Sequence, residues 1–80
     1  MLLKPVTSEK AVKLIDLENT LVFAVERRAT KKEIKKEIET LFNVKIKELR
    51  THIRNNEKFV YVKLAKEFPA VDLATKLGVI

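Results

Sequence analysis

The sequence predicts an α+β domain with the element order β-α-β-α-β-β-α. Three observations predict it: an apolar stripe at helical spacing follows Thr30, a short apolar stretch spans residues 20–25, and two β-rich runs flank an Asn-Asn turn. This mixture of strands and helices around one core is typical of an α+β sandwich. Eighty residues suit one core, and no linker, repeat or low-complexity segment divides them. We therefore expect a single domain over residues 1–80.

The first part of the chain predicts a short strand, a helix and a second strand. The short strand is expected over residues 1–4, where the proline that follows ends it. Thr7 or Ser8 then caps a helix that runs to about residue 17, because a side-chain hydroxyl accepts from an unpaired backbone N–H of the first turn. Asn19 follows its end. The stretch 20–25 is apolar on both faces, which predicts a central strand covered on both sides.

A helix with three distinct sides is predicted after Thr30, which stands at the N-cap position. Its apolar stripe, at i, i+4, i+7 and i+8, consists of Ile34, Ile38, Leu41 and Phe42. At about 100° per residue, one side of this stripe carries Lys31, Lys32, Lys35 and Lys36, and the other carries Glu33 and Glu37. Asn43 is suited to end the helix in a left-handed conformation.

The basic flank of this helix has two interpretations. It could be a solvated face that merely keeps the protein soluble. However, Arg27 and Arg28 extend it upstream, so that residues 27–36 carry six cations and one acid. A solubilising face usually mixes its signs, whereas this helix separates them. The pattern therefore favours contact with a polyanion.

The C-terminal half predicts a hairpin and a last helix. Residues 44–47 alternate as a strand, after which the apolar residues shift to odd positions, and this predicts a bulge or strong twist near residues 47–48. Residues 54–57 predict a tight turn, because asparagine tolerates positive φ. The returning strand is expected over residues 58–65. A proline opens the last helix and a glycine ends it, over about residues 69–77.

Composition indicates a nucleic-acid partner and excludes other classes. The formal net charge is +6 at pH 7, which indicates a polyanionic partner. No apolar run approaches the roughly 18 residues that span a bilayer, and the N-terminus lacks the apolar core of a signal peptide. We expect no membrane insertion. The lack of cysteine excludes disulfides and suits a reducing cytoplasm.

Catalysis is not expected. The single histidine, His52, has no serine–aspartate or cysteine partner at the spacing of a triad, and one glycine in the whole chain excludes a Gly-rich phosphate loop. No aspartate, glutamate or histidine cluster has metal-ligand spacing. We therefore expect no enzyme activity, no metal and no cofactor.

Basic and aromatic residues meet on the predicted hairpin. Its basic residues are Lys45, Lys47, Arg50, His52, Arg54, Lys58 and Lys63. On one face of the returning strand Phe59, Tyr61 and Lys63 alternate, a combination that can stack unpaired bases and hold phosphates. We expect Phe59 in the core and Tyr61 partly exposed. Since a glycine-aromatic RNA-recognition run is lacking, these features favour recognition of RNA backbone and shape over a base-reading code.

Several short motifs follow one another along the whole chain. They are Pro5-x-Thr7-Ser8-Glu9-Lys10-Ala11, Asn19-Thr20-Leu21-Val22-Phe23-x-Val25, Ala29-Thr30-Lys31-x-x-Ile34-Lys35, Leu41-Phe42-x-Val44-x-Ile46, Tyr61-Val62-Lys63-Leu64 and Asp72-x-Ala74-x-x-Leu77-Gly78-Val79-Ile80. In this order and spacing they resemble the universal large-subunit ribosomal protein family number twenty-three. The short turn at residues 54–57 is similar to the archaeal type, because bacterial members carry a long loop there.

The resemblance implies a four-stranded antiparallel sheet with helices on both faces, and a place in the large ribosomal subunit in the cytoplasm. There the protein would bind large-subunit rRNA beside the polypeptide exit tunnel, next to other ribosomal proteins. It would also offer a docking surface to the signal recognition particle and to nascent-chain chaperones. In the family the glutamate of the Ser-Glu-Lys motif takes part in that docking, and here it is Glu9. From the residues alone, Glu9 is a first-turn carboxylate that the helix dipole favours.

We therefore predict a structural, rRNA-binding protein that is a monomer when isolated. The expected RNA contacts are Lys10, Arg27, Arg28, Lys31, Lys32, Lys35, Lys36, Arg50, Lys58 and Lys63 at phosphates, and Asn19, Thr51 and Tyr61 at sugar or base edges. Two other interpretations stay open. One is a free-standing basic module that coats RNA or DNA outside the ribosome, and the other is an adaptor whose basic flank binds an acidic protein.

Overall fold

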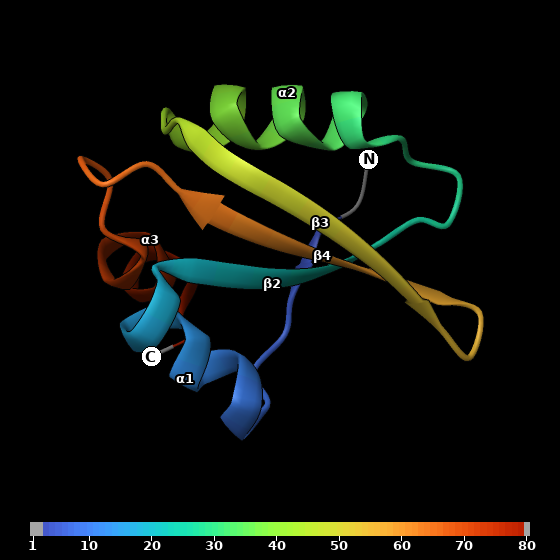
Figure 1. The fold of residues 1–80 in the computed structure, drawn as a ribbon, viewed down its shortest axis with the longest axis horizontal. Coiled ribbons are helices and arrows are strands. Elements are labelled where there is room, and N and C mark those ends of the chain that lie inside the picture. The colour runs from blue at the N-terminus through green and yellow to red at the C-terminus, as the bar shows by residue number, and fades with distance from the viewer. Residues whose placement is uncertain (1–2, 80) are drawn as a thin grey trace.

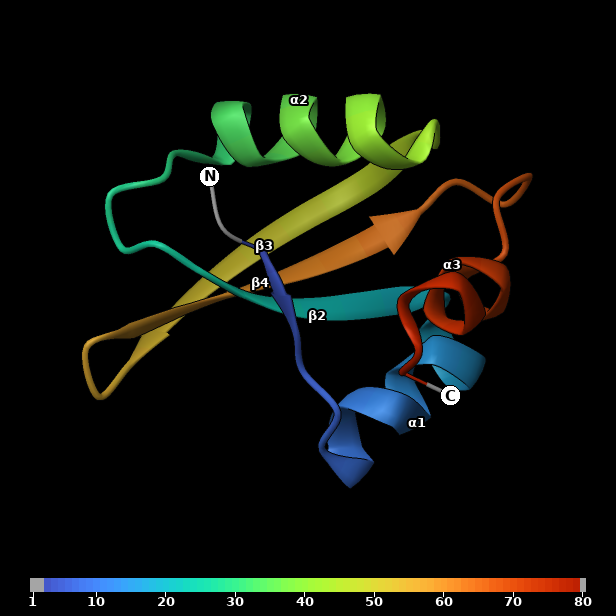
Figure 2. The same ribbon diagram turned by 180° about the vertical axis from the view of Figure 1, so that it is seen from behind.

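The computed structural model describes residues 3–79, which form a four-stranded antiparallel sheet and three helices (Figures 1 and 2). The elements are β1 (Lys4–Pro5), α1 (Glu9–Glu18), β2 (Thr20–Val25), α2 (Lys31–Phe42), β3 (Ile46–Arg54), β4 (Glu57–Leu64) and α3 (Ala70–Leu77). In the sheet the strands lie in the order β1-β2-β4-β3. The predicted α+β fold and its element order are confirmed.

Helices lie on both sides of the sheet. Figures 1 and 2 show α2 on one side and α1 on the other, with α3 next to α1 at the end where β2 begins. Phe23 of β2 faces α2, because its ring stacks on Phe42 at a centroid distance of 6.4 Å. The preceding residue, Val22, points to the opposite face of the sheet, where it lines the same hollow as Ala11 of α1. Both faces of β2 are therefore covered, as its apolar sequence predicted.

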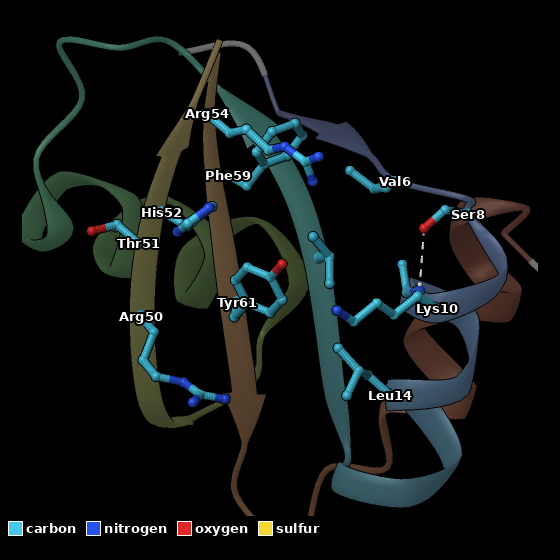
Figure 3. Close-up of a pocket in the computed structure, with 12 residues that line it drawn as sticks. Val6, Ser8, Lys10, Leu14, Arg50, Thr51, His52, Arg54, Phe59 and Tyr61 are labelled. Carbon is cyan, nitrogen blue, oxygen red and sulfur yellow. Dashed lines mark hydrogen bonds between the residues drawn. The ribbon is translucent and has the colours of Figure 1, made fainter. Parts of the chain in front are cut away.

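The core lies between the sheet and α2 and continues to α3. Its fully buried large side chains include Phe23, Ile34, Ile38, Val60, Val62 and Leu64. Each such burial contributes about 1.5–3 kcal/mol through the apolar surface removed from water. Along β4 these buried residues alternate with half-buried ones on the other face. On that face α1 covers β2 but leaves β4 and β3 open (Figure 3).

Side-chain caps and left-handed residues set the ends of α1 and α2. The Ser8 hydroxyl accepts from the Ala11 N–H, and the Thr30 hydroxyl accepts from the Glu33 N–H, both at 3.2 Å. Of the two caps predicted for α1, Ser8 is the one used. Asn19 and Asn43 end the two helices with φ of 52° and 54°, a region that asparagine tolerates better than other non-glycine residues.

The β3–β4 hairpin has the predicted turn and bulge. Asn55 and Asn56 connect the strands with φ of 51° and 65°, and positive φ at both central residues defines a type I′ turn. The pairing register shifts between Ile46 and Glu48, so Lys47 is the extra residue of a bulge. Beyond the bulge the odd-numbered residues of β3 face the core side, as predicted.

Two strand boundaries differ from the prediction. The first strand was expected to end before Pro5, but Lys4 pairs with Ala24 and Pro5 with Phe23; residues 1–2 lie outside the described part of the chain. Proline fits there because β1 is at the sheet edge, where a backbone N–H is not required. β3 begins at residue 46 and not at residue 44. Asn43 ends α2 in a left-handed conformation, and residues 44–45 form the connection from there to the strand.

Candidate nucleic-acid interface

One basic surface follows α2 and the loop before it, and we call it the helix surface. It consists of Arg27, Arg28, Lys31, Lys32, Lys35 and Lys36, and all six residues are exposed. The buried Ile34 and Ile38 fix the rotation of α2, so its lysines must face solvent. Within residues 3–79, the ion pairs of the structure involve none of these six cations. Their charge is available to an external anion.

Two hydrogen bonds hold the start of the helix surface against the hairpin. Arg27 donates from its guanidinium to the Asn56 side-chain oxygen at 3.0 Å. Lys58 donates from its ammonium to the Ala29 carbonyl. These two hydrogen bonds fix the loop before α2 to the tip of the β3–β4 hairpin.

A second basic surface lies on the open face of the hairpin, and we call it the sheet surface. It consists of Lys10, Arg50, His52, Arg54, Phe59, Tyr61 and Lys63. Strand pairing sets Arg50 opposite Tyr61, and Tyr61 opposite Val22. In the next row His52 lies opposite Phe59. Because paired residues on neighbouring strands point to the same face, cations, rings and apolar side chains alternate across the sheet.

The sheet surface surrounds a hollow of about 550 Å³ (Figure 3). Its basic lining residues are Lys10, Arg50, His52 and Arg54, and the rings of Phe59 and Tyr61 line it as well. In Figure 3 Lys10 reaches from α1 across β2 toward Tyr61, while Arg50 lies on the other side of that ring. No aspartate or glutamate is among the lining residues. The hollow is therefore suited to an anion with an apolar or aromatic part.

This combination of fold and basic surfaces agrees with a comparison to known families. Residues 1–67 match the family model described as Ribosomal protein L23. The chain belongs to this family. The family is structural and non-enzymatic, which confirms the prediction of a ribosomal protein without catalytic activity. The resemblance found in the sequence motifs is confirmed as well.

Two archaeal relatives extend the similarity over nearly the whole chain. One is named large ribosomal subunit protein uL23, from Methanothermobacter thermautotrophicus; it is 44% identical over 80 residues, which is 99% of this chain and 93% of the relative. The other carries the same name and is from Methanococcus vannielii, with 47% identity over 76 residues, 94% of this chain and 88% of the relative. The subunit named in both is cytoplasmic, in agreement with the predicted location.

Across residues 3–79, no helix has both the length and the apolar character that a membrane crossing needs. In the same residues no group of three or more histidine, aspartate or glutamate side chains is arranged to hold a metal ion.

Three of the predicted contact residues occupy structural positions. The Asn19 side chain donates to the carbonyls of Leu64 and Phe68 at 3.1 and 3.2 Å and accepts from the Ala70 N–H. Thr51 is among the residues that line the hollow, but it pairs with the buried Val60 and its hydroxyl points away from Tyr61 in Figure 3. The Lys58 ammonium is engaged with the loop before α2, as described above. We therefore give these three residues no part in the proposed interface.

The prediction that Phe59 belongs to the core is wrong. Phe59 is half-buried, lies on the face opposite to the buried Val60, and lines the hollow. The reason is that α1 covers β2 on this face without reaching β4, so a large ring there stays accessible. Tyr61, expected to be partly exposed, is half-buried beside it.

Sequence reasoning also left Arg54 and His52 out of the expected RNA contacts, although both line the hollow. A signal for them existed. With the turn at residues 55–56, the residues of the two strands pair one by one with increasing distance from the turn. Arg54 then lies opposite Glu57, His52 opposite Phe59 and Arg50 opposite Tyr61. The turn alone therefore brings these basic residues to the face that carries the rings.

Proposed function

We propose that the protein is a structural constituent of the large ribosomal subunit and that the whole chain acts as one rRNA-binding domain beside the polypeptide exit tunnel. The observation that carries this proposal is the outward-facing cations on both sides of the sheet in a member of a ribosomal protein family. Both relatives are named as large-subunit proteins, and the resemblance of the sequence motifs implies the tunnel exit.

Binding would depend mainly on phosphate neutralisation. Lysine and arginine side chains displace the counterions of the RNA backbone, and this release makes the affinity fall as salt rises. The helix surface supplies six such cations, and the sheet surface adds Lys10, Arg50, Arg54 and Lys63. Because the two surfaces lie on opposite sides of the sheet, one domain can contact two RNA segments and fix their separation.

The test is a salt titration of binding to fragments of large-subunit rRNA, with an unrelated RNA duplex as competitor. A preferred fragment that keeps its advantage over the duplex at physiological salt supports a ribosomal component. Equal affinity for every nucleic acid, lost as salt rises, would contradict the proposal and favour a free-standing basic module. Sedimentation of native extract gives a second test, because a subunit component must travel with large subunits.

We further propose that Glu9 helps to dock the signal recognition particle or nascent-chain chaperones. Glu9 starts α1, and its carboxylate pairs with Lys13 at 3.7 Å while its side chain stays 87% exposed. Large subunits that carry Glu9→Lys should bind the signal recognition particle more weakly than wild type. Glu18→Lys, at the other end of α1, is the matched control. Equal loss in both variants, or no loss in the Glu9 variant, would count against this role.

A further inference from the structure

We propose that the hollow on the sheet surface holds one unpaired RNA nucleotide, with its base stacked on Tyr61 and the phosphates on its two sides at Lys10 and Arg50. This inference rests on the proposed function, because it assumes that RNA is the partner, and it adds the structural class of RNA and the residue that recognises it. It follows from the ring, the charges and the size of the hollow.

The ring of Tyr61 is placed to act as a stacking platform. It lies in the middle strand of the open face, opposite Arg50 on β3 and Val22 on β2, and Figure 3 shows it face-on from the side of the hollow. A base inside a helix already stacks on its neighbours, so only an unpaired, splayed-out base can occupy such a ring. Phe59 lies two residues away on the same face and supplies a second ring.

The charges around the ring fit a nucleotide rather than an uncharged ligand. Lys10 on α1 and Arg50 on β3 lie on opposite sides of Tyr61 (Figure 3), and Arg54 lies near Phe59. The lining itself contains no carboxylate, although the Arg50 guanidinium also lies 3.5 Å from the carboxylate of Glu48, which is outside the lining. An arginine or lysine beside a stacked base is the combination by which proteins hold single strands without reading their sequence.

The size of the hollow argues for an unpaired nucleotide and against a helix. A volume of about 550 Å³ lies within the range of small-molecule sites, about 300–1,000 Å³. The apolar side chains of Val22 and Leu14 form part of its wall. They can contact the edge of a base or a sugar, but they supply no cation for the phosphates of a second RNA strand. We conclude that this face distinguishes unpaired from paired RNA, whereas the helix surface carries charge alone.

Tyr61 is the single tyrosine in the sequence, which allows a direct test. Protein grown with 3-fluorotyrosine gives one fluorine resonance, and that resonance reports on Tyr61. We would titrate it with a short oligoadenylate, with a fully paired duplex of the same length, and with the preferred fragment of large-subunit rRNA. Stacking predicts a ring-current shift with the oligoadenylate and with the rRNA fragment, and little or no shift with the duplex.

Three variants complete the experiment. Tyr61→Phe keeps the ring and should bind oligoadenylate as wild type does. Tyr61→Leu should lose about 5- to 150-fold in affinity, the equivalent of about 1–3 kcal/mol for one stacked base. Lys10→Ala removes an exposed side chain, so it leaves folding intact, and it should lower the preference for oligoadenylate over duplex. Lys31→Ala with Lys35→Ala should weaken binding but leave the fluorine shift at saturation unchanged.

The outcomes separate this inference from the proposed function. The inference of a stacked nucleotide would be overturned if the rRNA fragment bound specifically without a fluorine shift and Tyr61→Phe and Tyr61→Leu had equal affinity. The proposed ribosomal role would not be affected by that result. A failure to prefer any rRNA fragment would overturn both. A shift with the duplex equal to that with oligoadenylate would also overturn the inference, because a paired base cannot stack on this ring.

Discussion

The side-chain oxygen of Asn19 accepts a hydrogen bond from the backbone N–H of Ala70 at 2.6 Å, which joins the end of α1 to the start of α3. The amide nitrogen of the same residue donates to the carbonyls of Leu64 and Phe68. One side chain thus holds the loop between β4 and α3 against the left-handed end of α1. Pro69, at the N-cap of α3, provides no side-chain cap, so Asn19 replaces it from a distant part of the chain.

We predict that Asn19→Ala lowers the free energy of unfolding by about 2–5 kcal/mol. The variant loses the acceptor for the Ala70 N–H, worth about 1–3 kcal/mol, and it places alanine in a left-handed conformation, at about 1–2 kcal/mol. Asn43→Ala is the matched control. Asn43 has nearly the same φ of 54°, but no hydrogen bond from its side chain is found within residues 3–79. Urea denaturation should show a smaller loss for the control, and equal losses would contradict the role given to Asn19.

The type I′ turn of the hairpin gives a second prediction. Asn55→Ala should destabilise the protein by about 1 kcal/mol, because alanine at a φ of 51° meets the steric penalty that asparagine partly avoids. Asn55→Gly at the same position carries no such penalty and should be close to wild type. For a domain of this size 1 kcal/mol corresponds to about 4–8 °C in Tm, so thermal denaturation separates the two variants. If Asn55→Gly had a lower Tm than Asn55→Ala, this turn would not be type I′ in solution.

Most of the fold could be predicted because its signals are local. The caps Ser8 and Thr30, the left-handed asparagines and the two-residue turn each act on their own stretch of chain, and each fixed an element boundary to within a few residues. The bulge at Lys47 was visible as a change in the phase of apolar residues. The end of the first strand was not predictable in this way, because proline ends a central strand but is tolerated in an edge strand such as β1. Whether a strand lies at the edge of a sheet is not a local property of its sequence.

The candidate site was less predictable because it depends on contacts between distant residues. The lysines of the helix surface follow from helical periodicity around Ile34 and Ile38, and the structure exposes them as expected. The hollow instead requires that α1 cover β2 and stop short of β4, which no local pattern encodes. For this reason the sequence pattern predicts a core position for Phe59 and an RNA contact for Asn19. The Asn19 side chain instead bonds to Leu64, Phe68 and Ala70, which lie 45 to 51 positions further along the chain.

Glu48 gives a third prediction, because its carboxylate lies 3.5 Å from the Arg50 guanidinium and opposite Lys63 in the strand register. It competes with an incoming phosphate for both cations. Glu48→Gln should therefore raise the affinity for oligoadenylate about 2- to 10-fold at low salt, where exposed charges are screened least. Both side chains of the pair are more than half exposed, so the loss of the ion pair should change stability by less than about 1 kcal/mol.

The control for Glu48→Gln is Glu18→Gln, which raises the net charge by the same amount at the exposed end of α1. Filter-binding or anisotropy titrations of both variants in one buffer measure the difference. If the two substitutions raise the affinity equally, overall charge accounts for the effect and Glu48 has no specific influence on the sheet surface.

The helix surface gives the last prediction, through the salt dependence of rRNA binding. Lys31→Ala combined with Lys35→Ala should weaken binding of the preferred rRNA fragment. It should also reduce the slope of log affinity against log salt by about one unit for each lost phosphate contact. Both lysines are exposed on α2 and free of ion pairs within residues 3–79, so the double variant should fold normally.

The matched control is Lys66→Ala combined with Lys76→Ala, which removes the same charge from two exposed positions that lie outside both basic surfaces and in no ion pair within residues 3–79. A general attraction between a +6 protein and RNA would make the two double variants equal, because long-range steering depends on total charge. Direct phosphate contacts make them unequal, since counterions are released only where a cation reaches the backbone. An unchanged slope in the α2 variant would remove Lys31 and Lys35 from the interface, whatever the affinity does.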